Sequence, residues 1–294
     1  MAAETLSLAG KTALVTGSGR ETGIGAAIAR AFARNGAAVA IHYVSENSKA
    51  RAEKVAADIS REFGTKTTVV RGALDKVSTA TKIVKETLKE LDVTHIDILG
   101  AYLRNPEIVL NEAWTWLILG CDPVNNAGYG STTNLTEATP ELLEQEFGIN
   151  VFATIYLIQA VIGIGKMPRG GRILNVGSIA SKLGLELSAV YAAAKAAQDS
   201  LTASWAGQLG RSHGITVNTL APGPMLTDMS KGFLVAPDGS ASELQTGLLA
   251  QTRAEARIGT VNDMADVALL LVSEKSRWLT AQWISVSGGV TGTM

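Results

Sequence analysis

Lys11-Thr-Ala-Leu-Val15 runs directly into Thr16-Gly17-Ser18-Gly19-Arg20-Glu21-Thr22-Gly23-Ile24-Gly25, and this stretch decides the fold. Its apolar beginning predicts a short buried strand, and the apolar periodicity that follows predicts a helix ending near Asn35. Glycines let the backbone approach a pyrophosphate closely, and the uncovered N–H groups at a helix start favour an anion. With a further strand at 38–43, the sequence therefore predicts a dinucleotide-binding unit.

A second pattern is the run Tyr191-Ala-Ala-Ala-Lys195, whose tyrosine follows Ser178 by 13 residues. On a helix, Tyr191 and Lys195 lie on one face, one turn apart. An ammonium about 5 Å from a phenolate, at an effective dielectric near 20, gives roughly 3 kcal/mol of attraction, so we expect the pKa of Tyr191 to be lowered by about two units. Ser178 follows an apolar strand at 173–176 and could hydrogen-bond a substrate oxygen. Tyr-x-x-x-Lys alone is typical of an ordinary helix surface, so this centre depends on the dinucleotide unit beside it.

The rest of the chain alternates strand and helix patterns without a linker or repeat. Further strands are predicted at 66–71, 95–99, 216–220 and 283–286, and helices at 48–63, 79–91, 262–272 and from Thr139-Pro140 onward. Such alternation predicts an α/β fold with one domain over residues 1–294, a Rossmann-type doubly wound parallel sheet with helices on both faces. Substrate then binds outside the carboxyl ends of the strands.

Together these patterns resemble the short-chain dehydrogenase/reductase family over nearly the whole chain, and most closely its NADPH-dependent 3-oxoacyl and polyketide ketoreductases. The matching residues, in order, are Thr16-Gly17, Gly23-Ile24-Gly25, Asn125-Asn126-Ala127-Gly128, Asn150, Ser178, Tyr191, Lys195, and Pro222-Gly223 followed by Thr227. The resemblance implies that Tyr191 protonates a substrate carbonyl and that Ser178 steadies its oxygen. It also implies that Lys195 lowers the Tyr191 pKa and holds the nicotinamide ribose.

The resemblance assigns cofactor contacts as well. It implies that Asn126 and Gly128 flank the adenine ribose, that Thr227 meets the nicotinamide carboxamide, and that Asn150 anchors a water in the proton relay. On the residues alone, Asn150 is interpreted as a locally satisfied helix amide and Thr227 as a helix cap. A segment at 224–257 would cover the substrate. The complete predicted cofactor set is Gly17, Ser18, Arg20, Gly23, Ile24, Gly25, Tyr43, Ser45, Asn126, Ala127, Gly128, Tyr191, Lys195, Pro222, Gly223 and Thr227.

The glycine turn departs from the family pattern in its length. Residues 18–22 separate Gly17 from Gly23, which is two residues more than the family has. We expect the turn to bulge outward. Glu21 in the bulge would repel a phosphate unless its side chain faces solvent or pairs with Arg20.

The block at residues 100–123 departs further, because it separates the predicted strand at 95–99 from Val124-Asn-Asn-Ala-Gly128. Deleting the block restores a continuous strand and turn. We interpret it as a translated, retained intron. A Gly100 codon can begin with the bases of a splice donor site, and the codons of Pro123 and Val124 can contain the bases of a splice acceptor site. The alternative is an evolved arm or lid, helical over 106–119. Sequencing of spliced message distinguishes the two, and an intron here would impair folding or activity.

Cofactor preference depends on the end of the second strand, where His42-Tyr43-Val44-Ser45 carries no carboxylate. Relatives that prefer NAD place an acidic residue there to bind the adenosine 2′-hydroxyl. Without that residue a 2′-phosphate is not repelled, and Ser45 with Arg20 could donate hydrogen bonds to it. NADPH is therefore favoured over NADH.

The predicted function is an NADPH-dependent oxidoreductase that reduces a ketone or 3-oxoacyl carbonyl of a small molecule to a secondary alcohol. The enzymatic alternative is a polyol or steroid dehydrogenase, and the alternative of another class is a catalytically impaired NADPH-binding subunit. The resemblance implies a homodimer or homotetramer.

Composition limits the partners. The net charge is −1 and the isoelectric point is near 6.3, which indicates no basic surface for nucleic acid or an anionic membrane. The single Cys predicts no internal disulfide, and the three scattered His predict no metal site.

The uncharged segment at 147–165 is long enough to span a membrane, but Asn150 and Gln159 interrupt it, so we expect a buried helix. The cytosol is the expected location.

Overall fold

Short apolar runs form the strands, because a parallel sheet covered on both faces has no solvent side. β1 (Thr12–Val15) and β5 (Arg172–Val176) are buried at every position. The computed structural model describes residues 6–102, 135–184, 188–227 and 230–290. Within them, seven parallel strands pair in the order β3-β2-β1-β4-β5-β6-β7. The other strands are β2 (Ala38–Tyr43), β3 (Thr67–Arg71), β4 (Ile98–Ala101), β6 (Thr216–Pro222) and β7 (Trp283–Val286).

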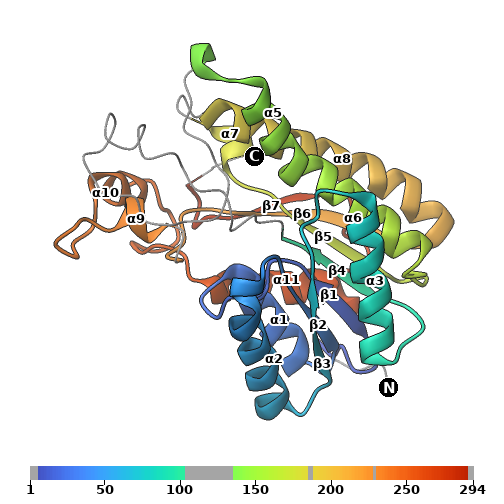
Figure 1. The fold of residues 1–294 in the computed structure, drawn as a ribbon. Helices are drawn as coiled ribbons and strands as arrows, with labels where there is room; N and C mark the ends of the chain where they lie inside the picture. Colours follow the sequence, from blue (N-terminus) through green and yellow to red (C-terminus); the bar gives the residue numbers. More distant parts are fainter. Residues whose placement is uncertain (1–5, 103–134, 185–187, 228–229, 291–294) are drawn as a thin grey trace.

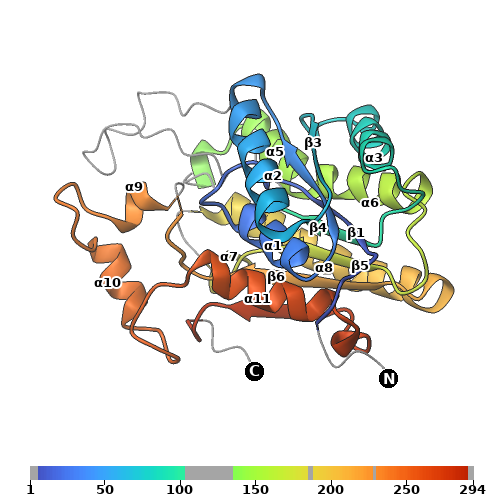
Figure 2. The same cartoon turned by 90° about the horizontal axis from the view of Figure 1, so that it is seen from below.

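Helices cover both faces of this sheet (Figures 1 and 2). One face carries α1 (Ile24–Arg34), α2 (Lys49–Phe63) and α11 (Val261–Val272), whose apolar side chains form one core with the sheet. The other face carries α3 (Val77–Leu91), α6 (Ala153–Gly163) and α8 (Ala189–His213), which form a second core. Phe32 of α1 is completely buried, a contribution of about 1.5–3 kcal/mol from its side chain. The predicted doubly wound sheet is confirmed.

Two predicted strands, at 38–43 and 283–286, match β2 and β7 residue for residue. The fourth strand differs, because β4 begins at Ile98 and continues through Gly100 and Ala101. Those two residues pair with Val15 of β1 and with Leu174 and Asn175 of β5. The strand therefore continues into the block at 100–123 instead of stopping before it. The block from residue 103 onward, including the helix predicted at 106–119, lies outside the described residues.

The long apolar segment before residue 165 is a composite helix. α5 (Pro140–Phe147) leads through a π-helical turn at Gly148–Phe152 into α6. Pro140 occupies the first turn and Thr139 accepts the Leu142 N–H, as expected for a helix start. By length and composition alone, Pro140–Gly163 could cross a membrane, and half of its most apolar window is buried in the structure. α6 packs against α3, as expected for a core helix.

The segment predicted to cover substrate extends beyond the end of β6. It contains the short helices α9 (Lys231–Leu234) and α10 (Glu243–Leu249), which both views show standing away from the sheet (Figures 1 and 2). Gly259 returns alongside Met225 through a parallel bridge, so the segment leaves and rejoins the body at one place.

Candidate active site

The four predicted catalytic residues come from segments that meet at the carboxyl edge of the sheet. Ser178 follows β5, and Tyr191 and Lys195 lie in the first two turns of α8. Asn150 lies in the π-helical turn Gly148–Phe152, which contacts α8. Interruptions of this kind inside α-helices are frequent at functional sites. The structure thus brings the four residues to one region.

The Ser178 hydroxyl neighbours the Tyr191 phenol and, as a hydrogen-bonding group, lowers the pKa of that phenol. The pKa of Tyr191 is raised to about 12, because burial penalises the phenolate and repulsion by the neighbouring Tyr102 and Glu146 adds to this, while the Ser178 hydroxyl opposes it. The predicted lowering of this pKa is therefore wrong for this structure. The phenol keeps its proton throughout the neutral range, which is the state that a proton donor requires.

Lys195 is buried and its ammonium is held by groups other than the phenol. Nζ donates to the Val176 carbonyl at 3.0 Å and to Gln198 Oε1 at 3.3 Å, and it lies 5.9 Å from the centre of the Tyr191 ring. Burial lowers the pKa of Lys195 to about 8, although Asp199 and Glu146 raise it in part. Burial penalises the charged form of both residues, which explains why the shift expected for Tyr191 is reversed.

Asn150 is buried and anchored to a residue that sequence reasoning missed. Its Nδ2 donates to the Glu146 carbonyl at 2.9 Å and to Glu146 Oε2 at 3.0 Å. Its own carbonyl accepts the Thr154 hydroxyl at 3.3 Å. Glu146 is fully buried, although carboxylates are rarely buried in a helix of a soluble fold. The signal for it was the i,i+4 spacing to Asn150, which by itself is unremarkable in a helix.

His42 at the end of β2 holds the glycine turn in place. Its Nδ1 accepts the Gly17 N–H at 3.1 Å, and its carbonyl accepts the N–H groups of Ser18 and Gly19 at 3.1 and 3.2 Å. The Ser18 hydroxyl donates to the Val15 carbonyl at 2.7 Å and accepts the His42 N–H at 3.0 Å. Gly17, at φ +62°, has the left-handed backbone that glycine tolerates best. Gly17 and Ser18 therefore shape the turn, with their N–H groups already engaged.

The start of α1 fits a dinucleotide pyrophosphate. Gly23 is the N-cap without a side-chain cap, and the first turn of α1 carries no acidic residue. The first N–H groups of a helix have no carbonyl partner within it, so those of Ile24 and Gly25 can face an anion. A Cβ on Gly25 would lie 2.5 Å from the Gly17 carbonyl oxygen, so only glycine permits this close turn.

The bulge of the turn is folded back onto α2. Glu21, expected either to face solvent or to pair with Arg20 if it is not to repel a phosphate, forms an ion pair with Arg51 at 3.0 Å. Burial opposes ionisation of Glu21, but a backbone hydrogen bond and the Arg51 guanidinium together lower the pKa of its carboxyl. Arg20 remains in the turn, where its carbonyl accepts the Gly23 N–H.

Tyr43 and Ser45 lie at the end of β2, next to this turn. Tyr43 is buried, and a Cβ added to Gly19 would lie 3.0 Å from the Cβ of Tyr43. The Ser45 hydroxyl is 3.2 Å from the Ser48 hydroxyl. The next acidic residue, Glu46, is engaged by Arg71 and by Lys49.

Pro222 ends β6, and Gly223 and Thr227 follow it. The Gly223 N–H donates to Val286, and a Cβ on Gly223 would lie 2.5 Å from Ser287 Cβ. Thr227 is buried and its Oγ1 accepts the Ser230 N–H at 3.3 Å, so it caps the turn that leads into α9. The N-cap of α9 is Ser230, so Thr227 lies in the turn before the helix and is not its cap.

Some predicted site residues lie outside the described residues, namely Asn126, Ala127 and Gly128. Among the residues that the structure describes, no group of three or more His, Cys, Asp or Glu side chains could hold a metal ion.

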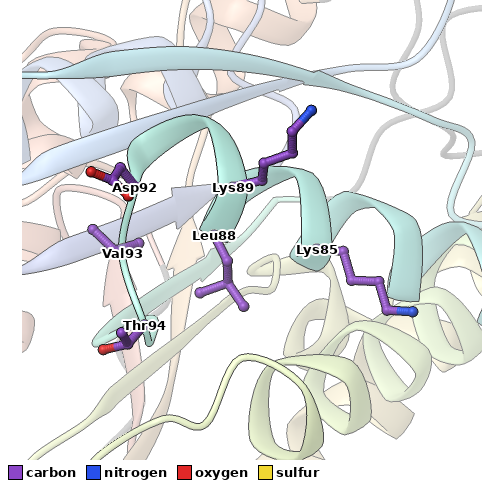
Figure 3. Close-up of a pocket in the computed structure, with 6 residues that line it drawn as sticks. All are labelled: Lys85, Leu88, Lys89, Asp92, Val93 and Thr94. Atoms are coloured by element: carbon purple, nitrogen blue, oxygen red, sulfur yellow. The ribbon is translucent and has the colours of Figure 1, made fainter.

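A surface pocket at the end of α3 is separate from this region. Figure 3 shows it lined by Lys85, Leu88, Lys89, Asp92, Val93 and Thr94. β4 begins only a few residues later, so the pocket lies at the amino-terminal edge of the sheet, opposite Ser178 and Tyr191.

The match to known proteins extends beyond these site residues. The family model described as short chain dehydrogenase matches residues 11–235. The chain belongs to this family. Its members are oxidoreductases, and the parallel sheet, the glycine turn and the Ser178, Tyr191 and Lys195 arrangement occur here within one matched region. Solved structures that are about 30% identical to this chain share its fold over almost their whole length.

Three relatives illustrate the similarity. The short-chain dehydrogenase/reductase FrzI of Cladobotryum sp is 32% identical, with 97% of each chain covered. Tetrahydroxynaphthalene reductase PfmaG of Pestalotiopsis fici is 31% identical, with 96% of this chain and 91% of the relative covered. The solved structure of the angucycline C-6 ketoreductase LanV with bound NADP is 30% identical, covers 98% of both chains and has a TM-score of 0.77.

His42 makes the stability of this short-chain dehydrogenase depend on pH. Burial lowers the pKa of His42 to about 4. An unfolded histidine titrates near 6.5, so below that pH the unfolded chain binds a proton that the folded chain refuses. The contribution of His42 is complete above about pH 6.5 and is lost as the pH falls toward 4. We expect this to remove about 2 kcal/mol from the free energy of unfolding at about pH 5.

Urea unfolding at about pH 7.5 and about pH 5 measures this loss. His42→Asn, whose amide can still accept from Gly17 and donate to the Gly72 carbonyl, is expected to lose about 2 kcal/mol less than the wild type over this interval. His213→Asn is the control, since that side chain is exposed. Equal losses in all three proteins would show that His42 does not carry the effect.

Proposed function

We propose that this short-chain dehydrogenase is an NADPH-dependent ketoreductase in which Tyr191 protonates the oxygen of a ketone or 3-oxoacyl carbonyl. The observation that carries the proposal is the Ser178 hydroxyl beside the Tyr191 phenol, with Lys195 Nζ 5.9 Å from the centre of the phenol ring at the carboxyl edge of the sheet. The names of PfmaG and LanV, a tetrahydroxynaphthalene reductase and an angucycline C-6 ketoreductase, support a carbonyl substrate of this kind.

The roles of the side chains follow from their environments. NADPH, when bound, supplies the hydride that reduces the carbonyl carbon. The Tyr191 phenol, protonated because it is buried, gives its proton to the carbonyl oxygen, and the Ser178 hydroxyl hydrogen-bonds that oxygen. The phenolate left behind is stabilised by the Lys195 ammonium, which a pKa of about 8 leaves mostly charged at neutral pH.

The groups at the end of β2 support a preference for NADPH. That end carries no carboxylate, and Glu46 just beyond it is paired with Arg71 and Lys49. Ser45 and Arg20 supply donors for a 2′-phosphate. We expect NADPH to bind at least about tenfold more tightly than NADH, a difference of about 1.4 kcal/mol. Titration of nicotinamide fluorescence with both cofactors measures it, and equal dissociation constants would contradict the assignment.

Consumption of NADPH in the presence of a panel of cyclic and 3-oxoacyl ketones tests the activity itself. Turnover of at least one ketone, with the alcohol as product, is the expected result. Oxidation of polyols or steroids without reduction of any ketone would favour the dehydrogenase alternative. We also propose a cytosolic homodimer or homotetramer, which light scattering of the purified protein and localisation in cells test.

The block at 100–123 supports one competing proposal, a catalytically impaired NADPH-binding subunit. Its residues after Ala101 separate the end of β4 from Val124-Asn-Asn-Ala-Gly128, the segment that the family resemblance assigns to the cofactor wall. Running the same panel on a form without residues 100–123 distinguishes the two. Activity only in the shortened form indicates a damaged enzyme, whereas tight NADPH binding without activity in either form indicates the binding subunit.

A further inference from the structure

A chain of buried polar groups connects Glu146 to Lys195. Asn150 donates to Glu146 Oε2 at 3.0 Å, and the Asn150 carbonyl accepts the Thr154 hydroxyl. Gln198 Nε2 donates to that hydroxyl at 3.2 Å, and Gln198 Oε1 accepts from Lys195 Nζ at 3.3 Å. Every member of this path is buried. It joins the end of α5, the π-helical turn and α8 in one network.

Glu146 differs from the other acidic residues of α5 in being completely buried. Glu141 and Glu144 on the same helix are exposed. A carboxylate withdrawn from water loses several kcal/mol of solvation unless hydrogen bonds or opposite charge replace it. The Asn150 amide provides one such bond, and the Lys195 ammonium provides opposite charge within electrostatic range. The burial of Glu146 is thus connected to the two residues around which the active site is built.

We propose that Glu146 is a positioning residue of the active site, which fixes Asn150 in the π-helical turn and holds Lys195 in its charged form. The effect of Glu146 on catalysis rests on the proposed function. Its electrostatic part concerns the folded chain alone and can be tested without a substrate.

The direction of the effect follows from the charges that face the pair. Lys195 is surrounded by Asp199 on its own helix and by Glu146 from α5, and both raise its pKa against burial. Tyr191 faces Tyr102 and Glu146, and both raise its pKa. A negative Glu146 therefore adds to the effect of burial in keeping the phenol protonated, and opposes the effect of burial in keeping the lysine charged. Both states favour donation of a proton to a carbonyl oxygen over its removal from an alcohol.

The test is the titration of Lys195, followed by NMR on protein carrying carbon-13-labelled lysine and assigned with Lys195→Met. In Glu146→Gln we expect the Lys195 midpoint to fall by about half a pH unit or more. Glu144→Gln, which removes the same charge from the exposed face of α5, is the matched control and is expected to leave the midpoint within about 0.2 unit. A Glu146→Gln midpoint that stays equally close to the wild type overturns the proposal.

Two further variants separate charge from packing. Glu146→Asp keeps the charge, so its Lys195 midpoint is expected to remain nearer to the wild type than that of Glu146→Gln, and an equal fall in both overturns the proposal. If Glu146→Gln does not fold, Glu146→Met removes the charge with an apolar chain of similar length and is read in the same way.

Kinetics then test the catalytic consequence separately. For any ketone that is turned over, we expect the alkaline limb of the kcat/KM profile for reduction to move to lower pH in Glu146→Gln and to stay in place in Glu144→Gln. If no ketone is turned over while the Lys195 midpoint still falls, the proposed function fails and the assignment of Glu146 stands. If neither the alkaline limb of the kcat/KM profile nor the Lys195 midpoint moves in Glu146→Gln, both the electrostatic and the catalytic part of the assignment are overturned.

Discussion

Tyr191→Phe is expected to reduce the rate of ketone reduction by about 10³-fold while leaving the NADPH dissociation constant within about twofold. The change removes the hydroxyl that would donate the proton, but it preserves the ring beside Lys195. General acid catalysis by a positioned side chain typically contributes 10²–10⁴-fold, and so the loss should fall mainly on kcat. Single-turnover kinetics and a fluorescence titration with NADPH measure the two quantities.

Tyr156→Phe is the control for this substitution. Tyr156 lies on α6 and packs at the margin of the core away from Ser178, so loss of its hydroxyl is expected to leave kcat unchanged. Retention of more than about a tenth of the wild-type rate in Tyr191→Phe would mean that another group, such as a water, protonates the oxygen.

Gly25→Ala is expected to weaken NADPH binding by at least about 100-fold and to lower the free energy of unfolding by about 2–3 kcal/mol. The added Cβ would lie 2.5 Å from the Gly17 carbonyl oxygen and 3.0 Å from Ser18 Cα, and both are backbone atoms that cannot rotate away. The turn and the first turn of α1 must therefore separate, which displaces the N–H groups that face the pyrophosphate. Urea unfolding and NADPH titration measure the two effects.

Gly207→Ala is the matched control for this change. Gly207 lies inside α8, and a Cβ there meets nothing within 4 Å. The substitution is expected to raise the free energy of unfolding by about 0.5–1 kcal/mol, because alanine favours helix more than glycine does, and to leave NADPH binding unchanged. Equal NADPH affinity in Gly25→Ala and Gly207→Ala would show that the close turn is not needed for the cofactor.

Local patterns predicted the framework well. β2 and β7 were placed residue for residue, and the helix starts at Pro140 and near Val261 follow from a proline in the first turn and a capping Thr260. These features depend on neighbours in sequence, namely the period of apolar residues and the residue types at helix ends. β4 was misplaced because its end is set by pairing with β1 and β5.

For the candidate site too, local features could be predicted from the sequence, whereas features that depend on tertiary packing could not. The spacing of Ser178, Tyr191 and Lys195, taken together with the dinucleotide-binding unit, predicted that they meet, since helix periodicity and strand ends are local properties. The direction of the Tyr191 pKa was not predictable, because desolvation depends on every chain segment that packs over the phenol. Glu146 was missed for a related reason, since its burial depends on α8 packing against the end of α5.

The sequence by itself determined that this chain is a doubly wound α/β protein with a dinucleotide turn and a Tyr191–Lys195 pair, because periodicity and glycine placement are written along the chain. The tertiary structure alone decided that His42 closes the turn, that Arg51 engages Glu21, and that burial dominates the charges in the active site. The physical reason is that solvation and charge energies depend on contacts between segments far apart in the chain, which no local pattern records.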